Sequence, residues 1–328
     1  MKTRFAFAVT GCLIAALASG EIDRGGITRG VLQSQMTIAG IVFNADSAAV
    51  TRNGTAVALE RLQRGQVLEV HGLLDPAAEN GLAASIHYDA ALIGPVQQVT
   101  PGEITVLGQR VLLSADTVLA DGLVPHRLLP GATVEVSGFH AAGGSAIYAT
   151  WIGEGHDATR VSGLLDGLDD VTGEFSINGL TGVVPADLRA TLGDAGWVRL
   201  SGDLFDGRFY VSSAEAVLAP AAGGQMVVFE GAVTAAGPDS FHIGEAVFEV
   251  DAFTRLTGAA FVAAGDLVVV TGAGRPDGSV LAYDIFINNS VIASEPHTDS
   301  SDDDDVDDDD SGDDDDDGDD DDDGDDDD

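Results

Sequence analysis

The chain has 328 residues, of which 45% are apolar, and its formal net charge is −40 at pH 7. Asp299 and residues 302–328 hold 23 of the 55 acidic residues, which leaves 32 acidic residues against 15 basic ones. Nucleic-acid binding needs Lys and Arg to displace counterions from phosphate, and Lys2 is the single lysine. The composition therefore argues against nucleic acid and anionic membrane surfaces as partners, while the apolar fraction suffices for sizeable cores.

Residues 1–18 have the pattern of a signal peptide. Lys2 and Arg4 precede an apolar run that is short for a membrane span, and small residues before Ser19 fit a cleavage site. We therefore expect an extracytoplasmic protein, in the periplasm, on the outer surface or secreted, without a transmembrane span after cleavage. A buried N-terminal helix is the alternative interpretation.

Cys12 leaves a second question open in this segment. The stretch Val9–Cys12 resembles a lipoprotein box, although the apolar run continues beyond the cysteine. If cleavage follows Ala18 instead, no cysteine remains for a disulfide, a catalytic thiol or a thiolate metal site.

A phrase of alternating residues then recurs four times along the chain. Apolar residues flank polar ones, as Val134 and Val136 flank Glu135, which predicts strands with one buried face. The copies are RGQVLEVHGLL (64–74), PGATVEVSGFH (130–140), DAGWVRLSGDL (194–204) and AAGDLVVVTGA (263–273), aligned on Gly72, Gly138, Gly202 and Gly272. Recurrence of this kind indicates copies of one structural unit.

Turn signals place this phrase in a hairpin. Pairs of Asn, Asp or Gly residues tolerate the positive φ of a type I′ turn, and an apolar strand follows each pair. The pairs are Asn80-Gly81, Gly143-Gly144, Asp206-Gly207 and Asp277-Gly278. An upstream hairpin is expected to turn at Asn53-Gly54, Gly108, Asn178-Gly179 and Gly244. A short helix fits the linker PADLRATLGDAG (185–196).

The sequence thus predicts an all-β fold of about four tandem, small OB-like five-stranded barrels with a disordered poly-Asp C-terminal tail. A set of small sandwiches is the alternative. The expected segments are a signal peptide (1–18), an N-terminal linker (19–35), β repeats at 36–92, 93–153, 159–219 and 226–292, and a disordered acidic tail (293–328).

These patterns resemble domain-of-unknown-function family 5666, a bacterial family of extracytoplasmic repeats. The resemblance lies in IDRGGITRG (22–30), GPVQQVTPGEITVLGQRVLLSADTVL (94–119) and GATVEVSGF (131–139). The second and fourth repeats are the most similar, and the third departs most, since Ala195-Gly196-Trp197 replaces its glycine start. The resemblance implies small OB-like β domains outside the cytoplasm. It implies no catalytic residues and no established ligand, and it does not extend to the acidic tail.

Motifs for catalysis are missing from the sequence, so we expect no enzymatic activity, no catalytic residues and no cofactor. There is no nucleophile elbow, zinc-binding helix or P-loop. TGAGRPDG (271–278) precedes a strand, which favours a turn over a phosphate loop. His87, His140 and His242 are interpreted as ordinary strand histidines, and His156-Asp157 as part of a loop.

The strand aromatics favour barrel cores, with ligand stacking on a barrel face as the alternative. They are Tyr148, Trp151, Trp197, Tyr210 and Tyr283. Nearby, Asp166, Asp169 and Asp170 gather oxygens that could hold calcium, but a solvated turn is the preferred interpretation.

The aspartate runs of the tail suggest weak cation binding. Asp313, Asp315 and Asp317 match the first half of an EF-hand loop, yet its twelfth position is Gly324 where a bidentate Glu is required. We therefore expect weak, non-specific, multi-site association with calcium, other divalent cations or cationic envelope partners. The candidate ligands are Asp313, Asp315, Asp317, Asp319, Asp321 and Asp323. A solubilising brush without a selected ligand is the equal alternative.

The leading functional interpretation is a non-enzymatic protein with a structural or interaction role at the cell envelope. A module that binds a small ligand or saccharide on a barrel face, for example around Trp151, is the alternative. A hydrolase with a non-standard site is a third hypothesis, and the sequence marks no residues for it.

Overall fold

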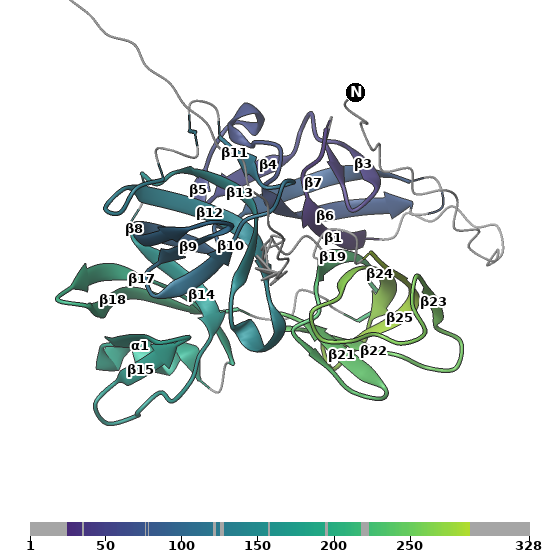
Figure 1. The fold of residues 1–328 in the computed structure, drawn as a ribbon. Coiled ribbons are helices and arrows are strands. Elements are labelled where there is room, and N and C mark those ends of the chain that lie inside the picture. The colour runs from purple at the N-terminus through teal and green to yellow at the C-terminus, as the bar shows by residue number, and fades with distance from the viewer. Residues whose placement is uncertain are drawn as a thin grey trace, which may run out of the picture. The chain divides into compact units, whose positions relative to one another are not determined.

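The computed structural model describes residues 25–288, except residues 35, 76, 78, 121–122, 125–127, 157, 194–195 and 218–222. Nearly all of the regular structure is β (Figure 1). The predicted signal peptide with Cys12 and the tail with the candidate ligands from Asp313 to Asp323 lie outside the described residues. Within the described part, no helix combines the length and apolar character needed to cross a bilayer.

Four stretches of the chain, called modules here, repeat one order of strand pairing. The first module contains β1 (Gly25–Val31), β2 (Thr37–Ile38), β3 (Ile41–Asn44), β4 (Ala49–Arg52), β5 (Thr55–Ala56), the 3₁₀ helix η1 (Leu59–Arg61), β6 (Val67–Asp75) and β7 (Asn80–Tyr88). The second contains β8 (Leu92–Thr100), β9 (Glu103–Val106), β10 (Gln109–Leu112), β11 (Val118–Leu119), β12 (Thr133–His140), the 3₁₀ helix η3 (Ala142–Gly144) and β13 (Ile147–Glu154).

The other two modules follow the same plan. The third contains β14 (Arg160–Leu164), β15 (Glu174–Ile177), β16 (Leu180–Val183), α1 (Ala186–Leu192), β17 (Trp197–Phe205) and β18 (Arg208–Ala216). The fourth contains β19 (Met226–Ala232), β20 (Ala235–Ala236), β21 (Ser240–Ile243), β22 (Ala246–Glu249), β23 (Arg255–Thr257), β24 (Leu267–Gly274) and β25 (Val280–Ile287). The helix α1 lies within the linker for which the sequence predicted one.

The second module is a closed five-stranded barrel. Its ring runs β8–β9–β10–β13–β12, and β12 pairs back with β8. In every module the second arm of a short hairpin pairs in parallel with the second arm of a long one, in the pairs β3–β7, β10–β13, β16–β18 and β22–β25. The predicted all-β fold with a small barrel is confirmed.

The repeated phrase forms the first arm of each long hairpin, namely β6, β12, β17 and β24. Its closing glycine marks a β-bulge in every case, because the register with the second arm shifts immediately before Gly72, Gly138, Gly202 and Gly272. A bulge bends a strand and increases its twist, which is what a small barrel requires at its corners.

The turns agree with the sequence in the second and third modules and differ in the first and fourth. In the fourth module Gly278 has positive φ (88°) and Asp277 does not. Leu107-Gly108, Asn178-Gly179, Gly143-Gly144 and Asp206-Gly207 all have positive φ at hairpin turns. In the first module, however, Glu79 takes the positive φ (52°), and Asn80-Gly81 belong to β7. Its short hairpin turns at Ala39-Gly40, while Asn53-Gly54 connects β4 to β5.

The modules pair with one another through the first strand of each, called its opening strand. β1 lies inside residues 19–35, the segment expected to be a linker, so the first module begins before residue 36. It pairs antiparallel with β6 and parallel with β19 of the fourth module. β8 and β14 join the second and third modules. One apolar cluster accordingly spans the second and third modules. Another lies mainly in the first module and includes Ile93 and Val228, and a third lies mainly in the fourth and includes Ile27.

The prediction that strand aromatics fill barrel cores is wrong for Trp151, Tyr210 and Tyr283. Trp151 is 2% exposed, but its ring makes an edge contact with Tyr88 and its Nε1 donates to Gln63, so it is buried against the first module. Tyr210 and Tyr283 are 48% and 47% exposed. Tyr210 faces outward because its strand neighbours Phe209 and Val211 take the inward positions, as the two-residue period of a strand requires.

Candidate binding cavity

A cavity of about 410 Å³ lies where strands of all four modules meet. Its walls come from β1, β6 and β7, from β12, from β14, β17 and β18, and from β19 with the turn between β21 and β22. The ionisable lining residues are Arg29, Glu69, His71, His87, Asp89, His140, Arg199, Glu215, Glu230 and Glu245. The volume is in the range of small-molecule sites.

The repeated phrase places charged side chains at the junctions between modules. Glu69, Glu135 and Arg199 each stand three residues before a closing glycine and point away from their own barrel core. The alternating pattern predicted a solvent-facing side here, yet Glu135 is only 1% exposed. Its carboxylate accepts hydrogen bonds from Arg52 (2.5 Å) and Asn53 (3.2 Å) of the first module. Neighbouring modules therefore cover faces that an isolated barrel would expose.

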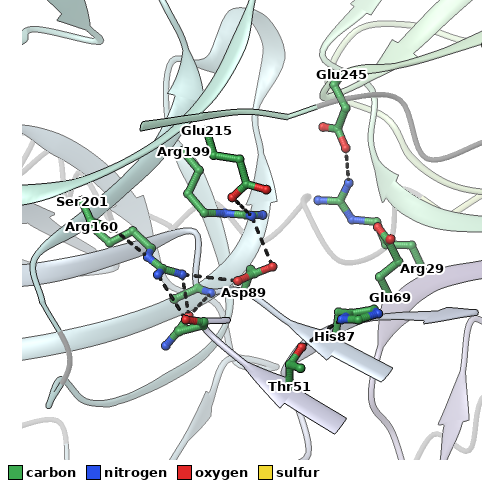
Figure 2. A network of polar contacts seen from close by, with 12 residues as sticks. Arg29, Thr51, Glu69, His87, Asp89, Arg160, Arg199, Ser201, Glu215 and Glu245 are labelled. Atoms are coloured by element: carbon green, nitrogen blue, oxygen red, sulfur yellow. Dashed lines mark hydrogen bonds and ion pairs between the residues drawn. The ribbon is translucent and has the colours of Figure 1, made fainter. Parts of the chain in front are cut away.

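Asp89, which directly follows the last strand of the first module, forms ion pairs with the third module. Its carboxylate lies 3.3 Å from the guanidinium of Arg160 and 3.3 Å from that of Arg199 (Figure 2). Arg199 also pairs with Glu215 across the β17–β18 hairpin at 3.0 Å. One wall of the cavity thus consists of carboxylates and guanidiniums that offset one another.

On the opposite side of Figure 2, Arg29 of β1 bonds to Glu245 in the β21–β22 turn at 2.8 Å. Glu69 is the cross-strand neighbour of Arg29, and its carboxylate pairs with His71 Nε2 at 2.7 Å. Burial alone would raise the pKa of Glu69, but the hydrogen bond with His71 and the charge of Arg29 outweigh it and lower that pKa. The same bond raises the pKa of His71.

Two lining groups lack such compensation. The Glu230 carboxylate accepts a hydrogen bond from the backbone N–H of Val31 at 2.9 Å, and burial raises its pKa to about 7. His140 Nδ1 is buried and has no hydrogen-bond partner among the described residues. Burial, reinforced by the charge of Arg29, lowers the pKa of His140 to about 4. Its ring makes an edge contact with Trp197 at 4.8 Å between centroids.

The histidines that the sequence singled out have different surroundings. His87 is fully satisfied, since its ring nitrogens lie 2.9 Å from Thr51 Oγ1 and 3.0 Å from Ser85 Oγ. His140 departs from the ordinary strand histidine that we expected, because its Nδ1 is buried without a partner among the described residues, although the side chain as a whole is half-buried. His156 is an exposed loop residue, as predicted, and Asp157 lies outside the described residues.

The predicted solvated turn near Asp169 is supported. Its carboxylate accepts the backbone N–H groups of Val171 (2.8 Å) and Thr172 (2.7 Å), which lower its pKa. In the described part of the chain, no group of three or more His, Cys, Asp or Glu side chains is arranged to hold a metal ion. The predicted tail ligands lie outside that part.

Sequence reasoning missed Glu69, Glu230 and Glu245 as lining residues. A usable signal exists for Glu69 and Arg199, because both occupy the same outward position of the repeated phrase. Glu230 and Glu245 belong to an opening strand and a turn, where a charged residue is unremarkable by pattern. Only the meeting of distant strands brings them to one cavity.

The fold and the cavity define a repeat protein of small OB-like β modules with a shared polar interior. The family model described as "Domain of unknown function (DUF5666)" matches residues 20–87, 93–153 and 230–285, more than half of the chain. The chain belongs to this family. The matches coincide with the first, second and fourth modules, and the third keeps the strand pairing without a match. A search of curated proteins finds no match.

Proposed function

We propose that this protein is a non-enzymatic, extracytoplasmic binding protein that holds a small polar molecule in the cavity between its modules. The observation that carries this proposal is the cavity itself, to which all four modules contribute charged or polar side chains. Small-molecule sites are concave, and a few convergent polar groups fix the ligand. A saccharide face built around Trp151 is not retained, because that ring is buried.

The geometry around His87 supports a binding role over a hydrolytic one. Nucleophilic catalysis needs a hydroxyl, a histidine base and a third group, often a carboxylate, that orients the base. Thr51 and His87 form the first pair, but Ser85 holds the other ring nitrogen. The nearby Glu69 bonds to His71 instead. The hydroxyl of Thr51 therefore lacks a base strengthened by a carboxylate.

The acidic tail adds a separate role in this proposal. Its aspartates would associate weakly with calcium or with cationic partners at the cell envelope, since closely spaced carboxylates attract divalent counterions. Calorimetric titration with calcium should give heat with the full chain and much less with a chain ending at Thr298. Equal heats would remove the tail from the proposal.

Mass spectrometry of the secreted protein would locate the mature N-terminus and test the signal peptide.

The binding proposal is tested by filling the cavity. Ala216 lines the cavity from β18, and Ala216→Phe places a ring into that space. Native mass spectrometry after incubation with small molecules from an envelope extract should show a bound mass on the wild-type protein and none on the variant. Thermal unfolding of both proteins checks that the variant folds. Absence of any retained molecule on the wild-type protein would contradict the proposed function.

A further inference from the structure

The cavity wall carries more negative than positive side chains. Its carboxylates are Glu69, Asp89, Glu215, Glu230 and Glu245, and its guanidiniums are Arg29 and Arg199. Arg29 offsets Glu245, and Arg199 is shared between Asp89 and Glu215 with help from Arg160. Glu69 is paired with a histidine. The fixed charges therefore leave the interior acidic.

Glu230 is the carboxylate that this network leaves uncompensated. It receives the Val31 backbone N–H, and no cationic side chain of the described residues pairs with it. An enclosed carboxylate is costly unless a positive charge or several hydrogen bonds offset it. A ligand that brings its own positive charge would supply the missing partner.

His140 and Trp197 make a second, independent feature of the same wall. The His140 ring is uncharged near neutral pH, and its Nδ1 is buried without a partner in the described part of the chain. Trp197 lines the cavity beside it. An uncharged imidazole does not repel a cation, and an indole face attracts one. Both groups suit a ligand that carries a positive charge.

We propose that the cavity binds a small organic cation carrying a protonated amine, which donates to the Glu230 carboxylate and lies against His140 and Trp197. This inference rests on the proposed function and adds the charge class of the ligand. A bare divalent metal ion fits less well, because the described residues hold no cluster of metal-ligating side chains. An ammonium group needs only a few acceptors around it.

Tryptophan fluorescence of the full chain tests this inference, because Trp197 lines the cavity and Trp151, the second tryptophan, does not. Cadaverine, pentanediol and glutarate share one carbon-chain length and differ in charge, so they serve as cationic, neutral and anionic probes at about physiological ionic strength. Cadaverine alone should change the emission saturably, and the acidic tail contributes no tryptophan to this signal. Glu230→Gln should weaken the apparent affinity for cadaverine by about tenfold or more, as expected for loss of a charge-assisted hydrogen bond.

Glu103→Gln is the matched control, because it removes a carboxylate outside the cavity and should leave the titration unchanged. Equal cadaverine titrations for wild type and Glu230→Gln would overturn the inference. So would a saturable response to pentanediol, to glutarate or to calcium chloride in place of cadaverine, although the cavity would then remain a binding site. If the wild-type protein retains a molecule from the extract in native mass spectrometry but does not respond to cadaverine, this inference fails and the proposed function stands.

Discussion

A Cβ atom at Gly202 would lie 2.0 Å from the carbonyl oxygen of Tyr210 in the adjacent strand. The corresponding distances at Gly72, Gly138 and Gly272 are 2.0, 2.2 and 2.3 Å, each to a carbonyl of the second hairpin arm. These contacts involve backbone atoms, which cannot swing aside as the end of a long side chain can. At each bulge the strands approach so closely that only glycine fits, and this explains why the phrase always closes on that residue.

Gly202→Ala should destabilise the protein by about 1–3 kcal/mol, the usual cost of forcing a methyl group into a packed site. Gly196→Ala is the control, because its Cβ would meet only Leu164 at 3.6 Å, an ordinary contact. Urea denaturation of both variants measures the difference. Equal midpoints would mean that the bulge does not require glycine.

Glu230 and His140 should make opposite contributions to the pH dependence of stability. The folded pKa of Glu230 is about 7 against an ordinary 4.5, so its contribution to stability falls as pH rises through that window, by about 3 kcal/mol in total. The folded pKa of His140 is about 4 against 6.5, so its contribution rises with pH over that range by a similar amount. The two pH dependences largely cancel in the free energy of unfolding of the wild-type protein.

Substitution of one of these residues should therefore reveal the pH dependence of stability that the other residue causes. Between about pH 5 and about pH 6.5, the free energy of unfolding of Glu230→Gln should rise with pH more steeply than that of wild type. The free energy of unfolding of His140→Gln should fall with pH over the same range. Urea denaturation across this range provides the free energies of unfolding, and groups common to all three proteins cancel in the comparison. Variant curves parallel to the wild-type curve would contradict the desolvation of these two half-buried side chains.

At the scale of elements, β1 is a strand that the sequence alone did not reveal. Its residues GGITRGV are short and rich in glycine, and one partner, β19, lies about two hundred residues along the chain. Thr28 illustrates the result, since its backbone pairs with Val70 on one side and Val228 on the other. Local patterns describe a strand by its own alternation, and they hold no information on a distant parallel partner.

Thr28→Pro should disrupt this junction, because proline removes a backbone donor in the middle of a sheet. Hydrogen exchange should then quicken in β6 and β19 and stay slow in β14 and β17, which belong to the separate core of the second and third modules. Thr28→Val is the control. It keeps the backbone and the side-chain shape and removes a buried hydroxyl that lacks a partner among the described residues. Faster exchange in all four strands would mean that the modules unfold as one unit.

At the scale of the whole molecule, the sequence predicted the repeated unit but not how the units pack against one another. The spacing of Gly72, Gly138, Gly202 and Gly272 predicted tandem hairpins and small barrels, because each signal is local to one module. The cavity depends on how modules cover each other's outward faces. Glu69 and Arg199 look like ordinary solvent-facing residues of an alternating strand until a neighbouring module is placed against them.

The contact between Arg29 and Glu245 tests this assembly most directly, because 216 sequence positions separate the two residues and they meet only if the first and fourth modules are joined as described. We propose a double-mutant cycle with Arg29→Gln, Glu245→Gln and the double variant, measured by urea denaturation. The structure predicts a favourable coupling of about 0.5–3 kcal/mol, as for residues in direct contact. Additive effects of the two substitutions, with no coupling beyond error, would contradict the arrangement of modules that encloses the cavity.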